Sequence, residues 1–440
     1  MTTSVPDRIR VRLSNWNSQL WRPLKSPWLV LGWLAVSVLF IVIISLLGGP
    51  TVNDSDVTVF TAWSLGHGHM ACAYLPPGIL GYPPTAPVYP IISGAVSALF
   101  QIGHSLPFPT SAQLGPHCVT ATAAIYQWSF HSGAVVPTLR IGYVGWFVLA
   151  AGLVALLRAS NRGRCGWELV GLVVLACLPP VSMCLAEYFH PQDLIAIGLV
   201  LAGLACCLRD RWVWAGVLFG LAISTQQFAI LVFVPLIAMA PRSRIPRLFV
   251  AAVATALMID VPIAILSSGR AIVGVFVGTG ASSYFNTVLD LLHLHGSSLY
   301  AVSRVVPILL ALALGWWAAE RLGPDVMKPV PLISVMATVL TFRLVFEVNF
   351  WGYYMMAVAV MLAALDLVRG RIRVSFVLWL LAVFLISLEG GLVNVPRFSW
   401  LPDWLWQVVF VPSALALAVS PLIKLVRDHR TTPAIETAHP

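Results

Sequence analysis

Twelve apolar segments alternate with short polar connections along this chain. Hydrophobic residues make up 59% of the sequence and charged residues only 10%, whereas a soluble domain carries roughly 25% charged residues. We therefore expect an all-α polytopic membrane protein with about 12 transmembrane or membrane-embedded helices. The apolar segments are residues 28–47, 137–157, 167–186, 194–208, 212–224, 226–240, 248–266, 299–318, 329–343, 350–367, 374–392 and 405–423. Several are shorter than a usual span, which leaves open whether 212–240 crosses fully.

The basic residues predict how these segments are oriented. If the N-terminus is inside, only five of the 26 Lys and Arg residues fall in or near the outer connections: Arg140, Arg270, Arg304, Arg343 and Arg397. This bias predicts a multi-pass protein of the cell membrane with both termini in the cytoplasm. The net charge of +9 does not indicate nucleic-acid binding, because the basic residues form short clusters between apolar segments.

The chain is expected to form one membrane domain, residues 28–430, between a cytoplasmic segment, 1–27, and a disordered cytoplasmic tail, 431–440. A large outer loop, 48–136, follows the first span. Within it, residues 87–103 are apolar enough to cross the membrane. A crossing there would place the basic loops that follow on the outer side, against the charge bias. We predict that 87–103 is an interfacial or re-entrant helix. A loop of this length usually has a function.

Two carboxylates, Asp54 and Asp56, follow the first apolar segment closely. Ionisable groups beside a bilayer are costly and mark candidate sites. Either carboxylate could accept a proton from a substrate hydroxyl as a general base. Two alternatives remain open: the pair caps the helix that follows, or it binds a divalent cation, although no firm ligand spacing accompanies it. The sequence itself requires no cofactor.

Three further polar groups are predicted at the outer face. The turn 187–193 carries Glu187, His190, Gln192 and Asp193, whose hydrogen-bonding side chains suit sugar hydroxyls, although ordinary interfacial polarity would also explain them. Arg304 and Arg343 lie in apolar sequence, where an arginine must pair or bind an anion. Arg343 could pair with Glu347 four residues later or bind a phosphate. His293 and His295 could add donors to the same anion.

Cysteines add one prediction, because Cys72 and Cys118 both lie in the large outer loop. That compartment permits disulfides, so we expect these two residues to bond. The other five cysteines lie in or beside apolar segments, where they pack as small apolar residues.

Four short motifs, in this order, resemble the GT-C superfamily of polytopic glycosyltransferases, above all the actinobacterial mannosyltransferases that use polyprenyl-phosphate-mannose. The motifs are Asp56-Val57-Thr58-Val59-Phe60 against Asp-x-x-Val-Tyr, Tyr82-Pro83-Pro84 before a juxtamembrane helix, the turn Phe189-His190-Pro191-Gln192-Asp193, and Gly216-Val217-Leu218-Phe219-Gly220-Leu221-Ala222. Gln226-Gln227 stands where these enzymes usually have Lys, a departure that puts the role of the 212–240 hairpin in question.

The resemblance implies a helical GT-C-like fold and inverting transfer of a sugar, mannose first, from a polyprenyl-phosphate donor to a hydroxyl of a cell-envelope glycan or glycolipid at the outer leaflet. It assigns the catalytic carboxylate to Asp56, with Asp54 as second choice. Arg343, Arg304, His293 and His295 would then bind the donor phosphate. Tyr82, Glu187, His190, Gln192, Asp193 and Glu347 would bind sugar or acceptor. The alternatives are a secondary transporter, a lipid-carrier flippase or a non-catalytic scaffold.

Overall fold

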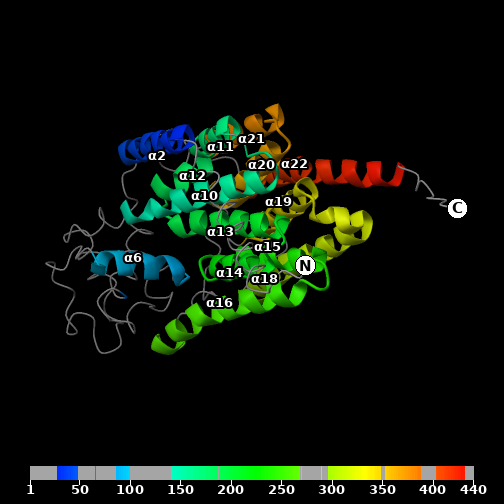
Figure 1. The fold of residues 1–440 in the computed structure, drawn as a ribbon, viewed down its shortest axis with the longest axis horizontal. Helices are drawn as coiled ribbons and strands as arrows, with labels where there is room; N and C mark the ends of the chain where they lie inside the picture. Colours follow the sequence, from blue (N-terminus) through cyan, green and yellow to red (C-terminus); the bar gives the residue numbers. More distant parts are fainter. Residues whose placement is uncertain are drawn as a thin grey trace, which may run out of the picture.

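The computed structural model describes residues 27–47, 65, 86–99, 140–163, 165–186, 188–267, 269, 289, 296–347, 352–387 and 403–431. These residues form fourteen α-helices and two short 3-10 helices, and none of them lies in a strand (Figure 1). The α-helices are α2 (Pro27–Leu47), α6 (Val88–Leu99), α10 (Val144–Ala159), α11 (Cys165–Ala176), α12 (Pro179–Ala186), α13 (Pro191–Leu208), α14 (Trp212–Ile223), α15 (Ala229–Met239), α16 (Ile245–Leu266), α18 (Gly296–Leu322), α19 (Pro329–Val345), α20 (Met356–Val368), α21 (Val374–Ser387) and α22 (Asp403–Thr431); the 3-10 helices are η4 (Gly323–Met327) and η5 (Gly352–Met355).

Each of the twelve predicted apolar segments overlaps at least one of these helices, so the all-α prediction is confirmed. Segment 167–186 holds two, α11 and α12, which are bent by 58° at their junction. The bend precedes Pro179-Pro180, because the residue before a proline avoids helical geometry and proline lacks the N–H that would continue the helix. Five of the described helices are long and apolar enough to cross a membrane, or six if the bent pair counts as one.

These long helices indicate a multi-pass membrane protein. Six other helices in the described part have apolar stretches of 10–17 residues, and α14, for example, spans roughly 18 Å of a hydrocarbon core about 30 Å thick. The short helices confirm that the predicted segments are helical. They do not show that the chain crosses the membrane twelve times. The terminal segments and most of the predicted outer loop 48–136 lie outside the described residues.

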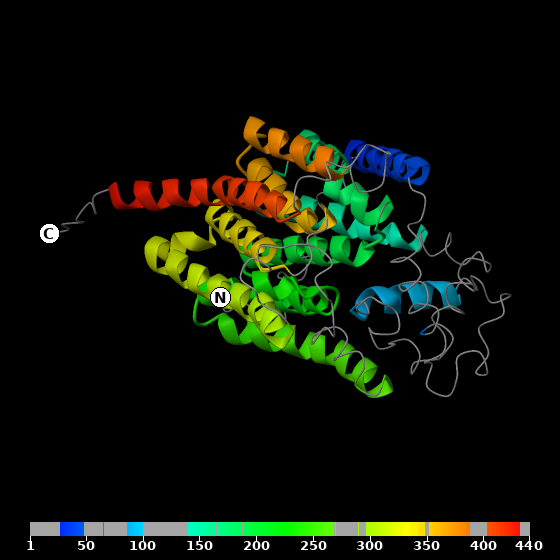
Figure 2. The same cartoon turned by 180° about the vertical axis from the view of Figure 1, so that it is seen from behind.

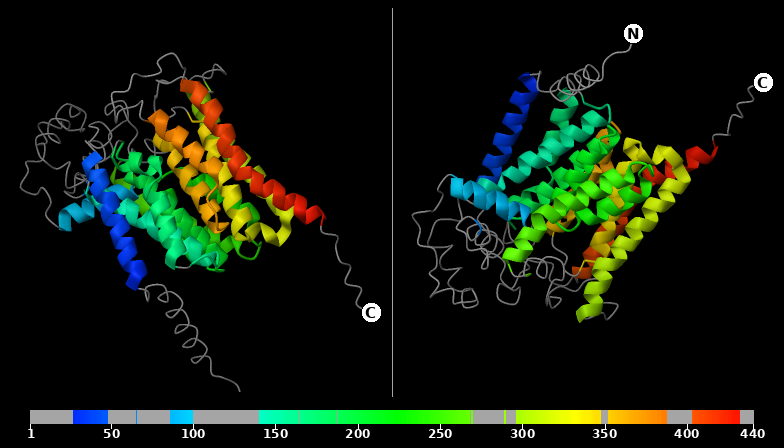
Figure 3. Two further views of the ribbon diagram at one scale, coloured as in Figure 1. Left: turned by 90° about the horizontal axis from the view of Figure 1, so that it is seen from above. Right: turned by 60° about the horizontal axis from the view of Figure 1, so that its bottom comes forward.

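Helix α13 lies in the middle of the bundle. It contacts α10, α14, α15 and α20, and Figures 2 and 3 show the whole bundle from other sides. Gly152 of α10 and Gly198 of α13 sit backbone to backbone, and a Cβ on either would collide with main-chain atoms of the other helix. The absence of side chains at this crossing explains how two helices approach so closely.

The bundle has two chemically different ends. One end, called the polar end, carries the start of α13, the α14–α15 connection and the end of α19, with His190, Asp193, Gln226, Arg343 and Glu347. It is the end at which α6 docks, and α6 lies on the left of Figure 1. The opposite end, called the basic end, holds the connections α10–α11, α13–α14, α15–α16, α18–α19 and α20–α21. Hydrogen bonds join these connections: Arg162 Nε donates to the Val368 carbonyl at 3.1 Å, and Arg244 Nη2 donates to Asp210 at 2.7 Å.

Helix α6 is the structural counterpart of predicted segment 87–103. At 12 residues it is roughly 18 Å long, too short for a span, which agrees with the prediction of a helix that does not cross. It docks at the polar end. The Val88 backbone N–H donates to the Ser224 carbonyl at 3.2 Å, and the fully buried Tyr89 ring lies edge-on to Phe189 at 6.3 Å between centroids.

Candidate functional site

The turn before α13 places three polar side chains at the polar end. Phe189 has a positive φ of 52°, which reverses the chain, and its buried ring packs on α6. The His190 backbone N–H bonds the Cys184 carbonyl at 2.5 Å. Pro191 then starts α13, because its fixed φ suits the first helical position. The result is a first turn in which Gln192 and Asp193 are buried.

Asp193 is held by the connection between α14 and α15. Gln226 Nε2 donates to Asp193 Oδ1 at 2.5 Å, and Gln226 Oε1 accepts the Gln227 backbone N–H at 3.1 Å. The amide of Gln226 is therefore oriented by its neighbour and presents its donor to the carboxylate. A buried carboxylate is costly unless it is hydrogen-bonded or paired, which accounts for this arrangement.

Arg343 occupies the last turn of α19, and its largely buried guanidinium is packed between aromatic rings. Its Cζ lies 5.3 Å from the centroid of Phe228 and 5.0 Å from that of Tyr354, distances at which a cation is attracted to the ring. Arg343 Nε donates to Glu347 Oε2 at 2.8 Å. The ion pair between Arg343 and Glu347, which the sequence offered as the alternative to phosphate binding, is present in the structure.

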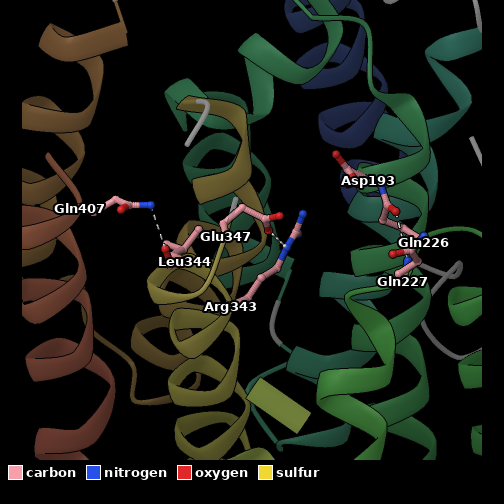
Figure 4. Close-up of polar contacts among 7 residues, drawn as sticks. All are labelled: Asp193, Gln226, Gln227, Arg343, Leu344, Glu347 and Gln407. Carbon is pink, nitrogen blue, oxygen red and sulfur yellow. Dashed lines mark hydrogen bonds and ion pairs between the residues drawn. The ribbon is translucent and has the colours of Figure 1, made fainter. Parts of the chain in front are cut away.

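Arg343 and Asp193 belong to one cluster although they lie on different helices. They are close enough for their charges to interact, and Asp193 also interacts with Glu347 and His190. Figure 4 shows the Arg343 side chain extending from α19 toward the side of the bundle that carries Asp193 and Gln226. Among the residues that the structure describes, Arg343 donates through Nε, and neither Nη group bonds another of these residues.

Aromatic rings line the cluster beside His190. The imidazole stacks on Tyr353 with 4.2 Å between centroids, and Tyr353 contacts Tyr188 at 4.8 Å and Tyr354 at 4.6 Å. His190 Nδ1 lies 2.8 Å from Gln192 Nε2 and 3.9 Å from Asp193 Oδ2. The other polar atom of the Gln192 side chain, Oε1, is buried without a hydrogen-bond partner among the described residues.

The structure brings together five of the predicted site residues: His190, Gln192, Asp193, Arg343 and Glu347. Arg304 lies on α18 with an exposed side chain. The other predicted positions fall outside the described residues: Asp54, Asp56, Cys72, Tyr82, Cys118, Glu187, His293 and His295.

Four further cluster members were not predicted from the sequence: Gln226, Phe228, Tyr353 and Tyr354. The sequence marks Gln226, because two adjacent glutamines, Gln226 and Gln227, interrupt an otherwise apolar stretch. It also marks the two tyrosines, because they follow Glu347 closely at the start of the next apolar segment. Within the described ranges, no group of three or more His, Cys, Asp or Glu side chains is arranged to hold a metal ion.

Comparison with known proteins assigns no family. No protein-family model matches the chain, and no curated protein is similar to it in sequence. Any function must therefore be argued from the buried cluster at the polar end and from the sequence motifs.

Proposed function

We propose that this chain is a GT-C-type membrane glycosyltransferase. It moves a sugar, with mannose the first candidate, from a polyprenyl-phosphate donor to a hydroxyl of a cell-envelope glycan or glycolipid. The observation that carries the proposal is the environment of Arg343. This cation sits at the end of an apolar helix, beside two aromatic rings, and within the described ranges its Nη groups bond no other residue.

A phosphate group fits this environment better than a neutral ligand does. The guanidinium fork matches two phosphate oxygens, and its fixed planar geometry loses little entropy on binding. The rings of Phe228 and Tyr354 and the ion pair with Glu347 hold the fork before a ligand arrives. In the proposal the fixed N–H donors of Arg343, and not a net positive charge of the cluster, stabilise the anion that develops when polyprenyl phosphate leaves the sugar.

The remaining roles follow from the chemistry of inverting transfer. In the proposal Asp56, with Asp54 as second choice, takes the proton from the acceptor hydroxyl. The acceptor oxygen bonds to the anomeric carbon while the bond from that carbon to the phosphate oxygen breaks, and polyprenyl phosphate leaves as an anion at Arg343. His190, Gln192 and Asp193 have donors and acceptors suited to sugar hydroxyls. The isoprenoid tail would lie in the membrane between helices.

The proposed orientation places the polar end outside the cell and the basic end in the cytoplasm. It is supported by the arginines gathered at the basic end, since positively charged connections remain cytoplasmic. A donor whose tail is in the outer leaflet and an acceptor in the envelope would both reach the polar end.

The test is a transfer assay with full-length protein in proteoliposomes that contain polyprenyl-phosphate-mannose and an extract of envelope glycolipids. We expect a mannosylated product from the wild type and none from Asp56→Asn, with both proteins showing the same thermal unfolding. Movement of intact donor across the bilayer without any mannosylated product would instead establish the lipid-carrier flippase and overturn the proposal.

A further inference from the structure

The charged side chains of the cluster at the polar end do not balance one another within the described part of the chain. The guanidinium of Arg343 interacts with two carboxylates, Asp193 and Glu347 (Figure 4). While His190 is neutral, these side chains together carry one negative charge. A negative charge at the site opposes the binding of an anion such as the donor phosphate, unless a further positive charge accompanies the anion.

The imidazole of His190 is placed to supply this positive charge. Its Nδ1 lies 3.9 Å from Asp193 Oδ2, a distance at which an opposite charge favours the protonated form. Its ring stacks on Tyr353 with 4.2 Å between centroids, and the face of an aromatic ring attracts a cation. An imidazole takes up and releases its proton between about pH 5 and 8.

The other titratable groups around this imidazole keep one charge state over that range. Arg343 stays protonated, and Asp193 and Glu347 each accept a hydrogen bond from a side-chain donor. The remaining groups are Tyr188, Tyr353 and Tyr354 beside the ring and Cys184 of α12, whose carbonyl accepts the His190 backbone N–H. Tyrosine and cysteine are ordinarily uncharged below about pH 8.

Gln192 can accommodate both states of the imidazole. Its side-chain Nε2 lies 2.8 Å from His190 Nδ1, so it donates to Nδ1 when the ring is neutral. Its Oε1 is buried without a hydrogen-bond partner among the described residues. If the amide turns over, Oε1 accepts from a protonated Nδ1. The amide N–H groups then occupy the place of Oε1, where a ligand oxygen is the acceptor that they need.

We propose that binding of the donor phosphate at Arg343 is coupled to the uptake of one proton by His190, with Gln192 as the positioning residue. The proton comes from water and adds to Nδ1 of the neutral ring. Gln192 Oε1 accepts the new N–H, and the proton returns to water when the ligand dissociates. This coupling rests on the proposed function, because it takes Arg343 as the ligand of the donor phosphate.

The test measures the Kd of full-length protein in nanodiscs for polyprenyl-phosphate-mannose, without acceptor, from about pH 8 to about pH 6. This donor is a phosphodiester, so it lacks the second ionisation that a phosphate monoester has near pH 6. Any change of Kd over this range therefore comes from the protein. The variant is His190→Gln, which cannot take up the proton. The matched control is His429→Gln, at an exposed position near the end of α22.

We expect the wild type and His429→Gln to bind the donor about tenfold more tightly at the lower pH, because the bound state holds one more proton. The Kd of His190→Gln should not depend on pH. Gln192→Met should weaken the pH dependence, since it removes the acceptor for the new N–H. A merely structural role of Gln192 would instead change the Kd equally at both pH values, and this result would overturn its assignment as the positioning residue.

Thermal unfolding shows which variants are folded, and Gln192→Met provides the test if His190→Gln is not. The same pH dependence in folded His190→Gln as in the wild type would overturn the coupling while leaving donor binding, and the proposed function, intact. A pH-independent Kd of the wild type would do the same. No donor binding by the folded wild type at any pH would overturn both the coupling and the proposed function.

Discussion

Gln226 donates a side-chain hydrogen bond to Asp193 at 2.5 Å, and this contact joins the turn between α14 and α15 to the first turn of α13. Both residues are in the cluster that contains Arg343. Among the described residues, the α14–α15 connection therefore supplies the side-chain hydrogen-bond donor to this buried carboxylate.

Replacing Gln226 with Ala should destabilise the protein. The change removes a donor from a buried carboxylate, a loss worth about 1–3 kcal/mol. A double-mutant cycle with Asp193→Ala, read out by unfolding in detergent, should show coupling of about 1–3 kcal/mol between the two positions. Strictly additive effects of the two changes would mean that this hydrogen bond contributes nothing.

Close helix packing gives a second prediction. Gly220→Ala adds a Cβ that would collide with the Ala252 carbonyl and the Thr255 side chain. Helices α14 and α16 must therefore separate, at a cost of about 1–3 kcal/mol. Gly166→Ala is the matched control, since its Cβ meets nothing within 4 Å. Thermal unfolding of both variants checks this, and equal stabilities would refute the packing explanation.

The ion pair at the basic end between α10 and α11 gives a third prediction. Arg158 binds Glu168 through both Nε at 2.6 Å and Nη2 at 2.8 Å, and the Glu168 side chain is 3% exposed. Glu168→Gln leaves a partly buried guanidinium without its counter-ion and should cost about 2–3 kcal/mol.

Asp325→Asn provides the contrast. Its pair with Lys328 has a similar distance of 2.8 Å, but the two side chains are 65% (Lys328) and 45% (Asp325) exposed. Solvent screens such a pair, so its loss should change stability by less than about 1 kcal/mol. If the two substitutions had the same effect in chemical denaturation, burial would not be what makes the Arg158–Glu168 pair important.

Much of the helical layout could be predicted from apolar segments, while the contacts of the candidate site could not. Each apolar run produced a helix because the runs are long and bounded by polar residues. The pairing of Arg343 with Glu347 was predictable as well, since residues four apart share a helix face. The contact between Gln226 and Asp193 was not, because it depends on how α13 packs against α14.

The two arginines predicted as phosphate ligands show the same limit. Arg304 and Arg343 both occur near the ends of apolar segments, so sequence alone gives them equal standing. In the structure, the side chain of Arg304 is exposed on α18 while Arg343 is packed between rings. Which side of a helix faces a neighbouring helix depends on tertiary packing. Only the structure therefore distinguishes the buried Arg343 from the exposed Arg304.

That difference gives a fourth prediction, now for activity. Arg343→Lys keeps the charge but removes the planar fork, and we expect kcat for sugar transfer to fall by about 10²–10³-fold. Arg304→Lys, at an exposed position, should change kcat by much less. Steady-state transfer rates of the two variants check this prediction. A larger loss for Arg304→Lys than for Arg343→Lys would contradict the assignment of the donor phosphate to Arg343.

The most direct test of the account is the affinity of the full-length protein for polyprenyl phosphate, the leaving group of the proposed reaction. Equilibrium binding in nanodiscs should weaken by about 10–100-fold in Arg343→Gln, as expected from the loss of hydrogen bonds to a charged group. Arg321→Gln should leave the Kd unchanged. Unchanged affinity in a correctly folded Arg343→Gln protein would contradict the assignment of Arg343 to the donor phosphate.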